Sequence, residues 1–363
     1  MTDANSWRGW RNENAERNAV KILVTGTDGY LGSLLTPILI RQGHEIRGID
    51  TGFYKSGCLY NGVAIAPSTL RKDIRHITAG DLESIDAVVH MAELSNDPTG
   101  ELSRNITYEI NHRGSVRLAE LACQAGVERF VYMSSCSVYG MASADYVTEE
   151  SSVNPQTAYA ICKTMVERDL RPMADDHFSP IFLRNATAYG ASPRMRFDIV
   201  LNNLAGLAWT TKEIKMVSDG TPWRPLVHAL DIAQAISCVL KAPRELVHNE
   251  ILNVGDTSQN YTIKEIAEIV AEVFPECELI FGSQGADDRS YRVSFDKIKA
   301  KLPDFRCEWN AHRGAQQLRD VFQRIDMAPE VFNARSFTRV KQLEYLIRTQ
   351  QIDQNFFWRD GAT

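Results

Sequence analysis

Three glycines at intervals of three follow directly after a run of apolar β-formers in the stretch "KILVTGTDGYLGSLL", residues 21 to 35. An ordinary strand-to-helix turn needs one glycine, but a diphosphate must lie close to the main chain at a helix N-terminus, where free N–H groups stabilise its charge. Gly26 would permit the tight turn, Gly29 the approach of the diphosphate, and Gly32 the close packing of the new helix. The spacing predicts a dinucleotide-binding turn, the alternative being a glycine-rich connection without a ligand.

Strand-like and helix-like segments alternate over the first half of the chain. Amphipathic stretches at 31–42, 105–125 and 157–172 separate the strand candidates. This alternation predicts crossover connections, and therefore a doubly wound α/β fold with a parallel (Rossmann) sheet. The strand candidates are 20–25, 44–50, 75–80, 86–92, 129–135 and 180–185.

The alternation fades after about residue 190, which predicts three parts of the chain. Residues 1–19 form an N-terminal extension, residues 20–190 form the NAD-binding Rossmann domain, and residues 191–363 form a smaller C-terminal substrate-binding lobe. A strand at 251–255 is expected to return to the Rossmann sheet. Thr262 and Glu265 have the spacing of a capping box and predict a helix start, and "FTRVKQLEYLIRTQQ" predicts a further helix near the C-terminus.

Composition limits the function classes. The chain has 363 residues, 44% of them hydrophobic, and a net charge of -6, which argues against a nucleic-acid surface. No apolar run reaches the length of a membrane span and the polar N-terminus lacks a signal peptide's apolar core, so we expect a cytoplasmic protein. The seven cysteines contain no CxxC pair and the histidines show no ligand spacing, so we expect neither disulfides nor a metal site.

An acidic residue at the end of the second strand indicates which dinucleotide binds. Asp50 follows Gly32 by 18 residues (50 − 32), near the separation at which a carboxylate accepts hydrogen bonds from the adenosine ribose. A carboxylate there would repel the additional phosphate of NADP, so NAD is favoured, although Arg47 nearby keeps NADP open. Asp81, at the end of the expected third strand, is placed to contact the adenine.

Tyr159 and Lys163 are the candidates for acid–base chemistry. They are four residues apart in "YAICK", so they share one face of a helix. A neighbouring ammonium favours the phenolate and lowers the pKa of a tyrosine. Ser134, Ser135 and Ser137 end the preceding strand and can offer a hydroxyl to a substrate oxygen.

Several motifs, in their order along the chain, resemble the extended short-chain dehydrogenases/reductases. They are "TGTDGYLG", "DAVVHMAE", "NHRGSVRLAE", "RFVYMSSCSVYG", "YAICK", "LRNATAYG" and "RPLVHALDIA". Within that group the chain is similar to the NAD-dependent epimerase/dehydratase branch, which acts on nucleotide-activated sugars. The resemblance covers residues 20 to 300.

The resemblance implies roles for individual residues. Tyr159 is the acid/base, Lys163 its electrostatic partner and ribose clamp, and Ser135 the hydroxyl donor, while Asn111 supports the catalytic helix. The glycine turn, the strand ends and the resemblance together give the residues expected to bind the cofactor. They are Gly26, Gly29, Tyr30, Leu31, Gly32, Asp50, Asp81, Leu82, Met91, Ala92, Glu93, Asn111, Ser134, Tyr159 and Lys163.

Three departures from the family pattern narrow the expected chemistry. Cys136 and Ser137 stand where sugar dehydratases carry an acidic pair, and where decarboxylating members carry a glutamate, so both reactions are disfavoured. Thr187 stands where most relatives carry an asparagine before "VYG" in the sixth-strand motif, which puts the usual substrate-amide contact in doubt. Glu93 stands where a second alanine is usual after "HMA", and the sequence does not indicate what it contacts.

A nucleotide sugar carries a diphosphate, which requires arginines outside the cofactor site. Arg224 matches the family's diphosphate-binding arginine, and Arg289 with Arg292 forms the best second pair, the alternative being solvated or structurally paired arginines. His228 is expected to pack rather than catalyse. The residues expected to bind substrate are Ser135, Ser137, Thr187, Arg196, Asn203, Arg224, Arg289 and Arg292.

The expected reaction is epimerisation through a keto-sugar intermediate. Tyr159 takes the proton from a sugar hydroxyl, the hydride moves to the nicotinamide, and the intermediate turns over and is reduced on its other face. The alternatives are an NAD(P)H-dependent 4-keto-sugar reductase and a non-catalytic NAD-binding protein. By resemblance, the helices at 105–125 and 157–172 would form a homodimer interface.

Overall fold

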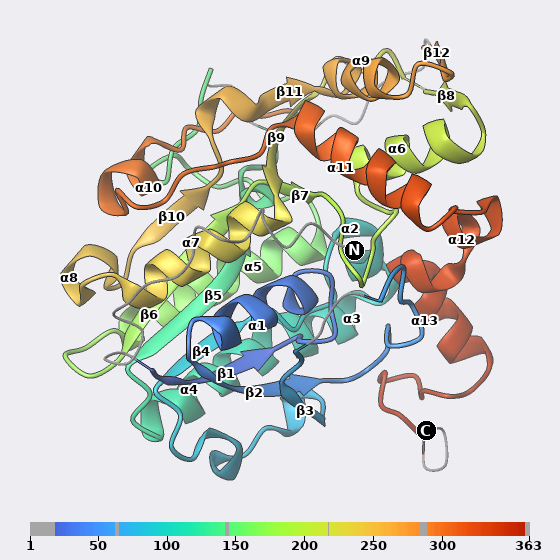
Figure 1. Cartoon of the computed structure of the whole chain (residues 1–363). Helices are drawn as coiled ribbons and strands as arrows, with labels where there is room; N and C mark the ends of the chain where they lie inside the picture. The colour runs from blue at the N-terminus through green and yellow to red at the C-terminus, as the bar shows by residue number, and fades with distance from the viewer. Residues whose placement is uncertain (1–18, 62–64, 142–144, 217, 283–288, 360–363) are drawn as a thin grey trace.

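The computed structural model describes residues 19–61, 65–141, 145–216, 218–282 and 289–359. Its centre is a sheet of seven parallel strands in the order β10-β6-β5-β4-β1-β2-β3 (Figure 1), so the predicted doubly wound α/β fold is confirmed. The strands are β1 (Lys21–Thr25), β2 (Glu45–Asp50), β3 (Ser68–Arg71), β4 (Ala87–His90), β5 (Arg129–Ser135), β6 (Ser179–Asn185) and β10 (Ile251–Val254).

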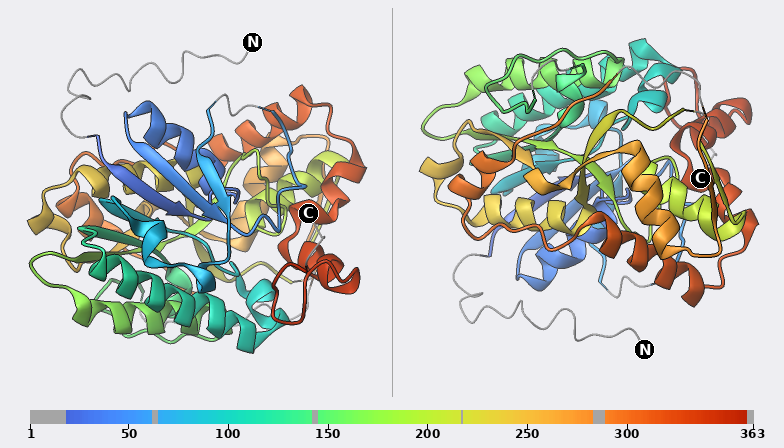
Figure 2. Two further views of the ribbon diagram at one scale, coloured as in Figure 1. Left: turned by 90° about the horizontal axis from the view of Figure 1, so that it is seen from below. Right: turned by 90° about the horizontal axis from the view of Figure 1, so that it is seen from above.

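Alternating side chains of each strand enter two separate cores, because successive residues of a strand point to opposite faces. Ile22 and Val24 belong to the core under α1 and α7, whereas Leu23 belongs to the core with Leu118 of α4 and Val166 of α5. Figure 2 shows the sheet between these two helix layers. The covering helices are α1 (Gly32–Arg41), α3 (Arg104–Thr107), the π-helix η5 (Tyr108–Gly114), α4 (Ser115–Gln124), α5 (Ala158–Leu170) and α7 (Ala229–Lys241).

The strand predicted at residues 75–80 is wrong. The chain there forms two 3-10 turns, and the third strand in sequence order is β3. Asp73 caps the first turn by accepting the N–H of Arg75, and Thr78 with Asp81 forms a capping box on the second. These side chains bond the local backbone and so compete with a strand ladder. The two turns are η3 (Ile74–His76) and η4 (Ala79–Leu82).

A smaller lobe stands over the carboxyl ends of the strands, with its own core (Figure 1). The predicted capping box is confirmed, because the Thr262 hydroxyl accepts the Glu265 N–H and the Glu265 carboxylate accepts the Thr262 N–H. The lobe contains the sheet β11-β9-β7, the pair β12-β8, and the helices α6, α9 and α11. Their bounds are β7 (Thr187–Tyr189), α6 (Val200–Thr210), β8 (Glu213–Lys215), β9 (Trp223–His228), β11 (Asn260–Thr262), α9 (Ile263–Val273), β12 (Glu278–Ile280) and α11 (Ala311–Arg324).

Three segments that follow residue 190 pack on the Rossmann half. β10 pairs with β6, and α7 lies beside α1. The C-terminal segment packs there too, since Leu343 and Leu346 of α13 share a core with Ile49. The remaining elements are α2 (Asp97–Leu102), η6 (Cys136–Tyr139), η7 (Arg171–Met173), α8 (Arg244–Val247), η8 (Thr257–Gln259), α10 (Asp296–Lys301), α12 (Pro329–Asn333), η9 (Arg335–Phe337) and α13 (Arg339–Arg348).

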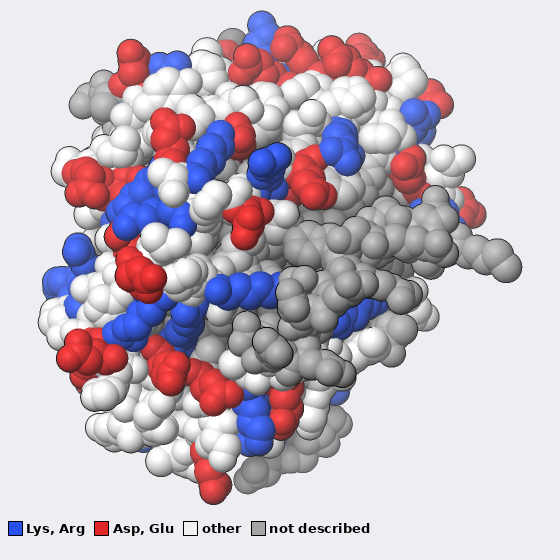
Figure 3. Space-filling model, turned by 60° about the vertical axis from the view of Figure 1, so that its left-hand side comes forward, with Lys and Arg blue, Asp and Glu red and all other residues white. Residues whose placement is uncertain are grey.

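Acidic and basic side chains are interspersed on the face shown in Figure 3. In the part of the chain that the structure describes, no helix is both long and apolar enough to cross a bilayer. The same residues contain no group of three or more His, Cys, Asp or Glu side chains arranged to hold a metal ion.

Candidate active site

A cavity of about 610 Å³ lies at the carboxyl ends of the parallel strands, against the lobe. Its volume falls in the range of small-molecule sites, about 300 to 1,000 Å³. Ligands of doubly wound sheets bind at this edge. The predicted site residues that line it are Gly26, Gly29, Tyr30, Leu31, Gly32, Asp50, Met91, Ala92, Glu93, Ser134, Ser135, Ser137, Tyr159, Lys163, Thr187, Arg196, Arg224 and Arg289.

The glycine turn is closed so tightly that no side chain fits at two of its positions. Gly26 has φ +82, a backbone conformation that favours glycine. A Cβ at Gly32 would lie 2.1 Å from the carbonyl oxygen of Gly26, because the start of α1 packs directly on the turn. The bare backbone at this helix N-terminus therefore fits the diphosphate of a dinucleotide.

Asp50 lines the same cavity at the end of β2. Its carboxylate accepts the N–H groups of Asp28 at 3.0 Å and Gly52 at 2.7 Å. Burial raises the pKa of Asp50 to about 6, against the effect of those two bonds. Arg47, which kept NADP open, donates instead to the carbonyl oxygens of Asp81 and Glu83.

Neither Asp81, predicted to contact the adenine, nor Leu82, predicted to bind the cofactor, lines the cavity. Leu82 is fully buried in the core below β4. Asp81 belongs to the capping box of η4 rather than to a strand end, and its carboxylate binds Lys72 at 2.6 Å. Lys72 does line the cavity, so Asp81 reaches the site only through that lysine.

Tyr159 is held in the first turn of α5, with its ring in the cavity. Thr157 caps this helix, and the Glu101 carboxylate accepts the N–H of Ala158 at 2.8 Å. Lys163 lies one turn further on, with its Nζ 5.3 Å from the centre of the Tyr159 ring. The pKa of Tyr159 is raised above its ordinary value, chiefly by burial, although Lys163 and the nearby Ser135 lower it, so the lowered pKa expected from the Tyr159 and Lys163 pair is not found.

The three serines after β5 differ in what their hydroxyls contact. Ser134 donates to the buried Glu167 carboxylate at 2.5 Å, which also pairs with Arg184, so its hydroxyl serves the core. Ser135 faces Tyr159. The buried Ser137 hydroxyl has no hydrogen-bond partner among the described residues. Ser135 and Ser137 are therefore the hydroxyls that remain for a ligand.

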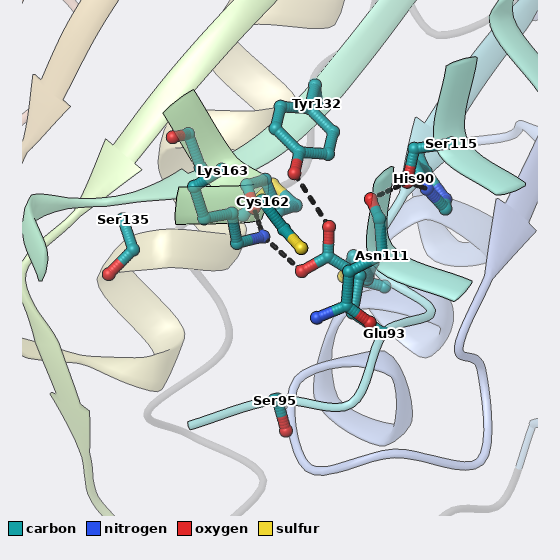
Figure 4. Close-up of polar contacts among 12 residues, drawn as sticks. His90, Glu93, Ser95, Asn111, Ser115, Tyr132, Ser135, Cys162 and Lys163 are labelled. Atoms are coloured by element: carbon teal, nitrogen blue, oxygen red, sulfur yellow. Dashed lines mark hydrogen bonds and ion pairs between the residues drawn. The ribbon is translucent and has the colours of Figure 1, made fainter. Parts of the chain in front are cut away.

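Glu93 forms an ion pair with Lys163 at the base of the cavity (Figure 4). Its other carboxylate oxygen accepts the Tyr132 hydroxyl at 2.7 Å. Since both oxygens accept donors, the carboxylate is held ionised although burial raises the pKa of Glu93. Lys163 also donates to the Met133 carbonyl, and although burial lowers its pKa, Glu93 raises it above the ordinary value. The sequence indicated no contact for Glu93.

A buried polar chain beside this ion pair positions the loop that follows β4. His90 joins Thr25 and Ser115 at 2.7 Å each, and burial followed by the charge of Lys163 lowers its pKa to about 3, so the ring is neutral (Figure 4). Asn111, in the π-helix, bonds both backbone groups of Leu94. The expectation that Asn111 supports the catalytic helix therefore needs correction, because its side chain is used by this loop. It does not line the cavity.

Of the expected substrate residues, two lie outside the cavity. The Asn203 amide donates to the Phe197 carbonyl, and Arg292 pairs with Asp145 at 2.8 Å while lying over Trp223. Both are occupied in packing the lobe, so neither is carried forward as a substrate contact. His228 packs as expected, stacked on Trp309 and bonded to Gln317, with a pKa lowered to about 3 chiefly by burial.

Three arginines expected to bind substrate do line the cavity. Arg224 and Arg289 come from the lobe side, where Arg224 donates to the Arg289 carbonyl and Arg289 pairs with Asp97. Arg196 pairs with Asp198 at 2.9 Å and donates to Ser95 at 3.1 Å. The cavity therefore has cationic groups on two sides.

Sequence reasoning missed some cavity residues altogether. Ser95 and Asp198 stand beside motifs that were recognised, and adjacency to them was the available signal. Arg339 comes from α13, far along the chain, and lines the cavity with only 3% of its surface exposed. Its position at the start of a helix carried no signal of its own.

Comparison with known proteins relates this geometry to a family. The model of the NAD dependent epimerase/dehydratase family matches residues 22–255. A UDP-glucose 4-epimerase of Bacillus subtilis (strain 168) is 27% identical over 326 residues, covering 82% of this chain and 94% of the relative. A UDP-N-acetyl-alpha-D-glucosaminuronate decarboxylase of Bacillus cytotoxicus is 24% identical over 298 residues, covering 78% and 89%. The solved structure of MoeE5 in complex with UDP-glucuronic acid and NAD matches with a TM-score of 0.73 and 25% identity, over 84% of this chain and 99% of that one.

Proposed function

The chain belongs to the NAD-dependent epimerase/dehydratase family, and from that premise we propose that it is a nucleotide-sugar epimerase that acts by transient oxidation of a sugar hydroxyl. The observation that carries the proposal is the shared cavity of Ser135, Tyr159 and Lys163 with the glycine turn. An acid–base group thus faces the place where a dinucleotide would present its reactive end.

The chain's own residues account for the movement of the proton. Ser135 and Tyr159 line the same cavity, and Ser135 is close enough to lower the pKa of the phenol, so a sugar hydroxyl that binds between them is oriented toward the phenolic oxygen. Tyr159 accepts the hydroxyl proton during oxidation and returns it during reduction. Lys163 stabilises the phenolate form of Tyr159, which is present before the oxidation and again after the reduction.

NAD is the cofactor of this family, and the residues present fit it. The glycine turn would hold its diphosphate, Asp50 its adenosine ribose, and Lys163 its nicotinamide ribose. When bound, NAD supplies a reversible hydride acceptor. The Asp50 carboxylate at the ribose favours NAD over NADP.

Loss of water and loss of carbon dioxide are both disfavoured, although a decarboxylase is among the relatives. Cys136 occupies one of the positions where those reactions need an acidic pair. Its thiol is buried, donates to the Arg184 carbonyl at 3.2 Å, and has a pKa raised well above its ordinary value by burial. Such a group neither gives nor takes a proton near neutral pH. Epimerisation needs no acid–base group besides Tyr159.

Conversion of nucleotide sugars by the purified protein tests the proposal. We expect UDP-sugars, the class bound by MoeE5, to be converted to their epimers with no net change in absorbance at 340 nm. A second candidate is a 4-keto-sugar reductase, because Glu93 opposes Lys163 and favours the protonated, proton-donating form of Tyr159. A reductase would consume NADH in proportion to product, and such a result would replace the epimerase assignment.

Three finer features belong to the same proposal. The substrate diphosphate binds Arg224 and Arg289 on the lobe side of the cavity. The enzyme is a cytoplasmic homodimer whose interface is formed by the helical stretch 104–124 together with α5, which leave Tyr108, Ile161 and Met165 partly exposed. Light scattering coupled to size exclusion measures the mass that tests the dimer.

A further inference from the structure

A segment beyond the family-matched region covers one end of the cavity. It runs from η9 through α13 to residue 358, here called the C-terminal strap. The Gln342 side chain donates to the Phe53 carbonyl at 3.0 Å, and the Trp358 indole donates to the Thr51 carbonyl at 2.7 Å. Phe357 stacks on His76 at 4.7 Å between ring centres. The strap thus lies along the loops after β2 and β3, where the adenosine half of a dinucleotide binds.

The strap places one charged side chain inside the cavity. The Arg339 guanidinium stacks on the Tyr54 ring at 3.9 Å, and its side chain is 3% exposed. No carboxylate of the described residues forms an ion pair with it. Burial, followed by the charge of Arg196, lowers the pKa of Arg339 to about 10. A buried cation without an anionic partner is costly, so this position favours an anionic ligand.

The neighbouring carboxylates do not pair with the Arg339 guanidinium. Asp198 uses both carboxylate oxygens on Arg196 and also accepts the Asn96 amide and the backbone N–H of Arg339. It therefore neutralises Arg196, while the Arg339 guanidinium interacts with it only at longer range. Asp50 lies further off and has a pKa raised to about 6 by burial. The Arg339 guanidinium therefore has no ion pair of its own among the residues that the structure describes, and its donors are placed for an anionic ligand.

The position of this charge selects the ligand. Arg339 stacks on Tyr54, just after β2, and lies within electrostatic range of Asp50, while Arg196 lies within that range of Tyr30 in the glycine turn. The two arginines thus connect the expected ribose site with the expected diphosphate site. Arg224 and Arg289, in contrast, lie on the lobe side of the cavity.

We propose that Arg339 of the C-terminal strap, assisted by Arg196, binds the diphosphate of NAD opposite the glycine turn, so that the strap retains the cofactor. This inference rests on the proposed function only in taking NAD as the resident cofactor. Arg196, expected from the sequence to bind substrate, is assigned here to the cofactor. A fork-shaped guanidinium suits a diphosphate because it forms paired bonds to phosphate oxygens. A retained cofactor is what an epimerase requires, since NAD is regenerated in each cycle.

Binding measurements on NAD-free protein test the inference without any turnover. Arg339→Met keeps the apolar stem and removes the charge, Arg339→Lys keeps the charge and removes the fork, and Lys341→Ala removes an exposed charge from the same helix. By calorimetry, we expect Arg339→Met to weaken NAD and ADP-ribose by about 10- to 100-fold, Arg339→Lys to weaken both less, and Lys341→Ala to leave both unchanged. Desalting should then strip NAD from Arg339→Met but not from the parent protein.

Binding of UDP to the NAD-loaded protein separates the two sources of a diphosphate. The inference predicts that UDP affinity stays within about twofold of the parent in the Arg339→Lys variant. A loss of UDP affinity with NAD affinity intact would assign Arg339 to the substrate and overturn it. Unchanged NAD affinity in folded Arg339→Met would also overturn the inference. If Arg339→Met does not fold, unchanged NAD affinity in Arg339→Lys would overturn it instead. If the parent protein converts no nucleotide sugar but Arg339→Met still weakens NAD binding, the epimerase proposal is refuted and the Arg339 inference stands.

Discussion

The carboxylate of Glu93 is ion-paired with the ammonium of Lys163, and both side chains are almost completely buried. The lysine that would lower the pKa of Tyr159 therefore has its charge largely balanced within the protein. Glu93 itself raises the pKa of Tyr159. The Glu93–Lys163 pair therefore adjusts the pKa of Tyr159, the proposed acid–base group. The motifs that contain Glu93 and Lys163 do not indicate that the two side chains meet.

Replacing Glu93 by Gln should shift the pH profile of sugar oxidation. Tyr159 accepts a proton only when deprotonated, so kcat/KM rises as pH rises through its pKa. Without the Glu93 charge that pKa falls, and we expect the rising limb to move to lower pH by about one unit. Tyr132→Phe is the control, because it removes a hydrogen bond to Glu93 without removing charge. Equal profiles for Glu93→Gln and the parent would contradict the argument.

Replacing Tyr159 by Phe removes the proposed acid–base oxygen while keeping the ring. We expect kcat to fall by about 10²- to 10⁴-fold, because the proton then lacks a positioned acceptor. NAD affinity should change by less than about twofold, since the glycine turn and Asp50 remain. Steady-state kinetics and calorimetry separate the two effects. Full turnover by this variant would mean that the catalytic assignment is wrong.

Ser134 and Ser135 form a matched pair of test positions, because only Ser135 faces Tyr159. We expect Ser135→Ala to lower kcat by about 10- to 100-fold with little change in the free energy of unfolding. Ser134→Ala should instead lower the free energy of unfolding by about 1 to 3 kcal/mol, since the buried Glu167 loses a donor. Urea unfolding and kcat measured on both variants test this; the reverse pattern would exchange their roles.

The affinity for NAD should depend on the ionisation of Asp50. Ribose hydroxyls donate to the ionised carboxylate, so binding favours that form. Because burial raises the pKa of Asp50 to about 6 in the free protein, NAD affinity should be full above that pH and fall as pH is lowered through it. Asp50→Asn should bind NAD more weakly and lose this dependence. Calorimetry between pH 5 and 8 gives the result, and an unaltered slope in Asp50→Asn would point to another group.

Two glycines should differ sharply in their tolerance of alanine. Gly32→Ala places a Cβ 2.1 Å from the Gly26 carbonyl oxygen, so the turn must open, and we expect a loss of about 3 kcal/mol in the free energy of unfolding together with weaker NAD binding. Gly80→Ala meets only the Thr78 hydroxyl, at 3.9 Å, and should stay within about 0.5 kcal/mol of the parent. Chemical denaturation of both variants makes the comparison.

Local sequence patterns predicted most of the fold and failed where local side chains competed with a strand. The strands at β1, β2, β4, β5, β6 and β10 were anticipated because buried parallel strands are continuous apolar runs. Residues 75–80 were predicted as a further strand. Asp73 and the Thr78–Asp81 box instead satisfy the backbone locally, and the edge strand forms earlier, at β3.

The sequence by itself determined where the glycine turn lies, that Asp50 ends a strand, and that Tyr159 and Lys163 share one face of a helix. Each of these depends on spacings of a few residues along one element. Only the tertiary structure decided what Glu93 and Arg339 do. Glu93 meets Lys163 because β4 and α5 converge at one edge of the sheet, and Arg339 enters the cavity because the strap packs back over β2. Spacing along the chain carries no information about such contacts, since they arise from packing between distant elements.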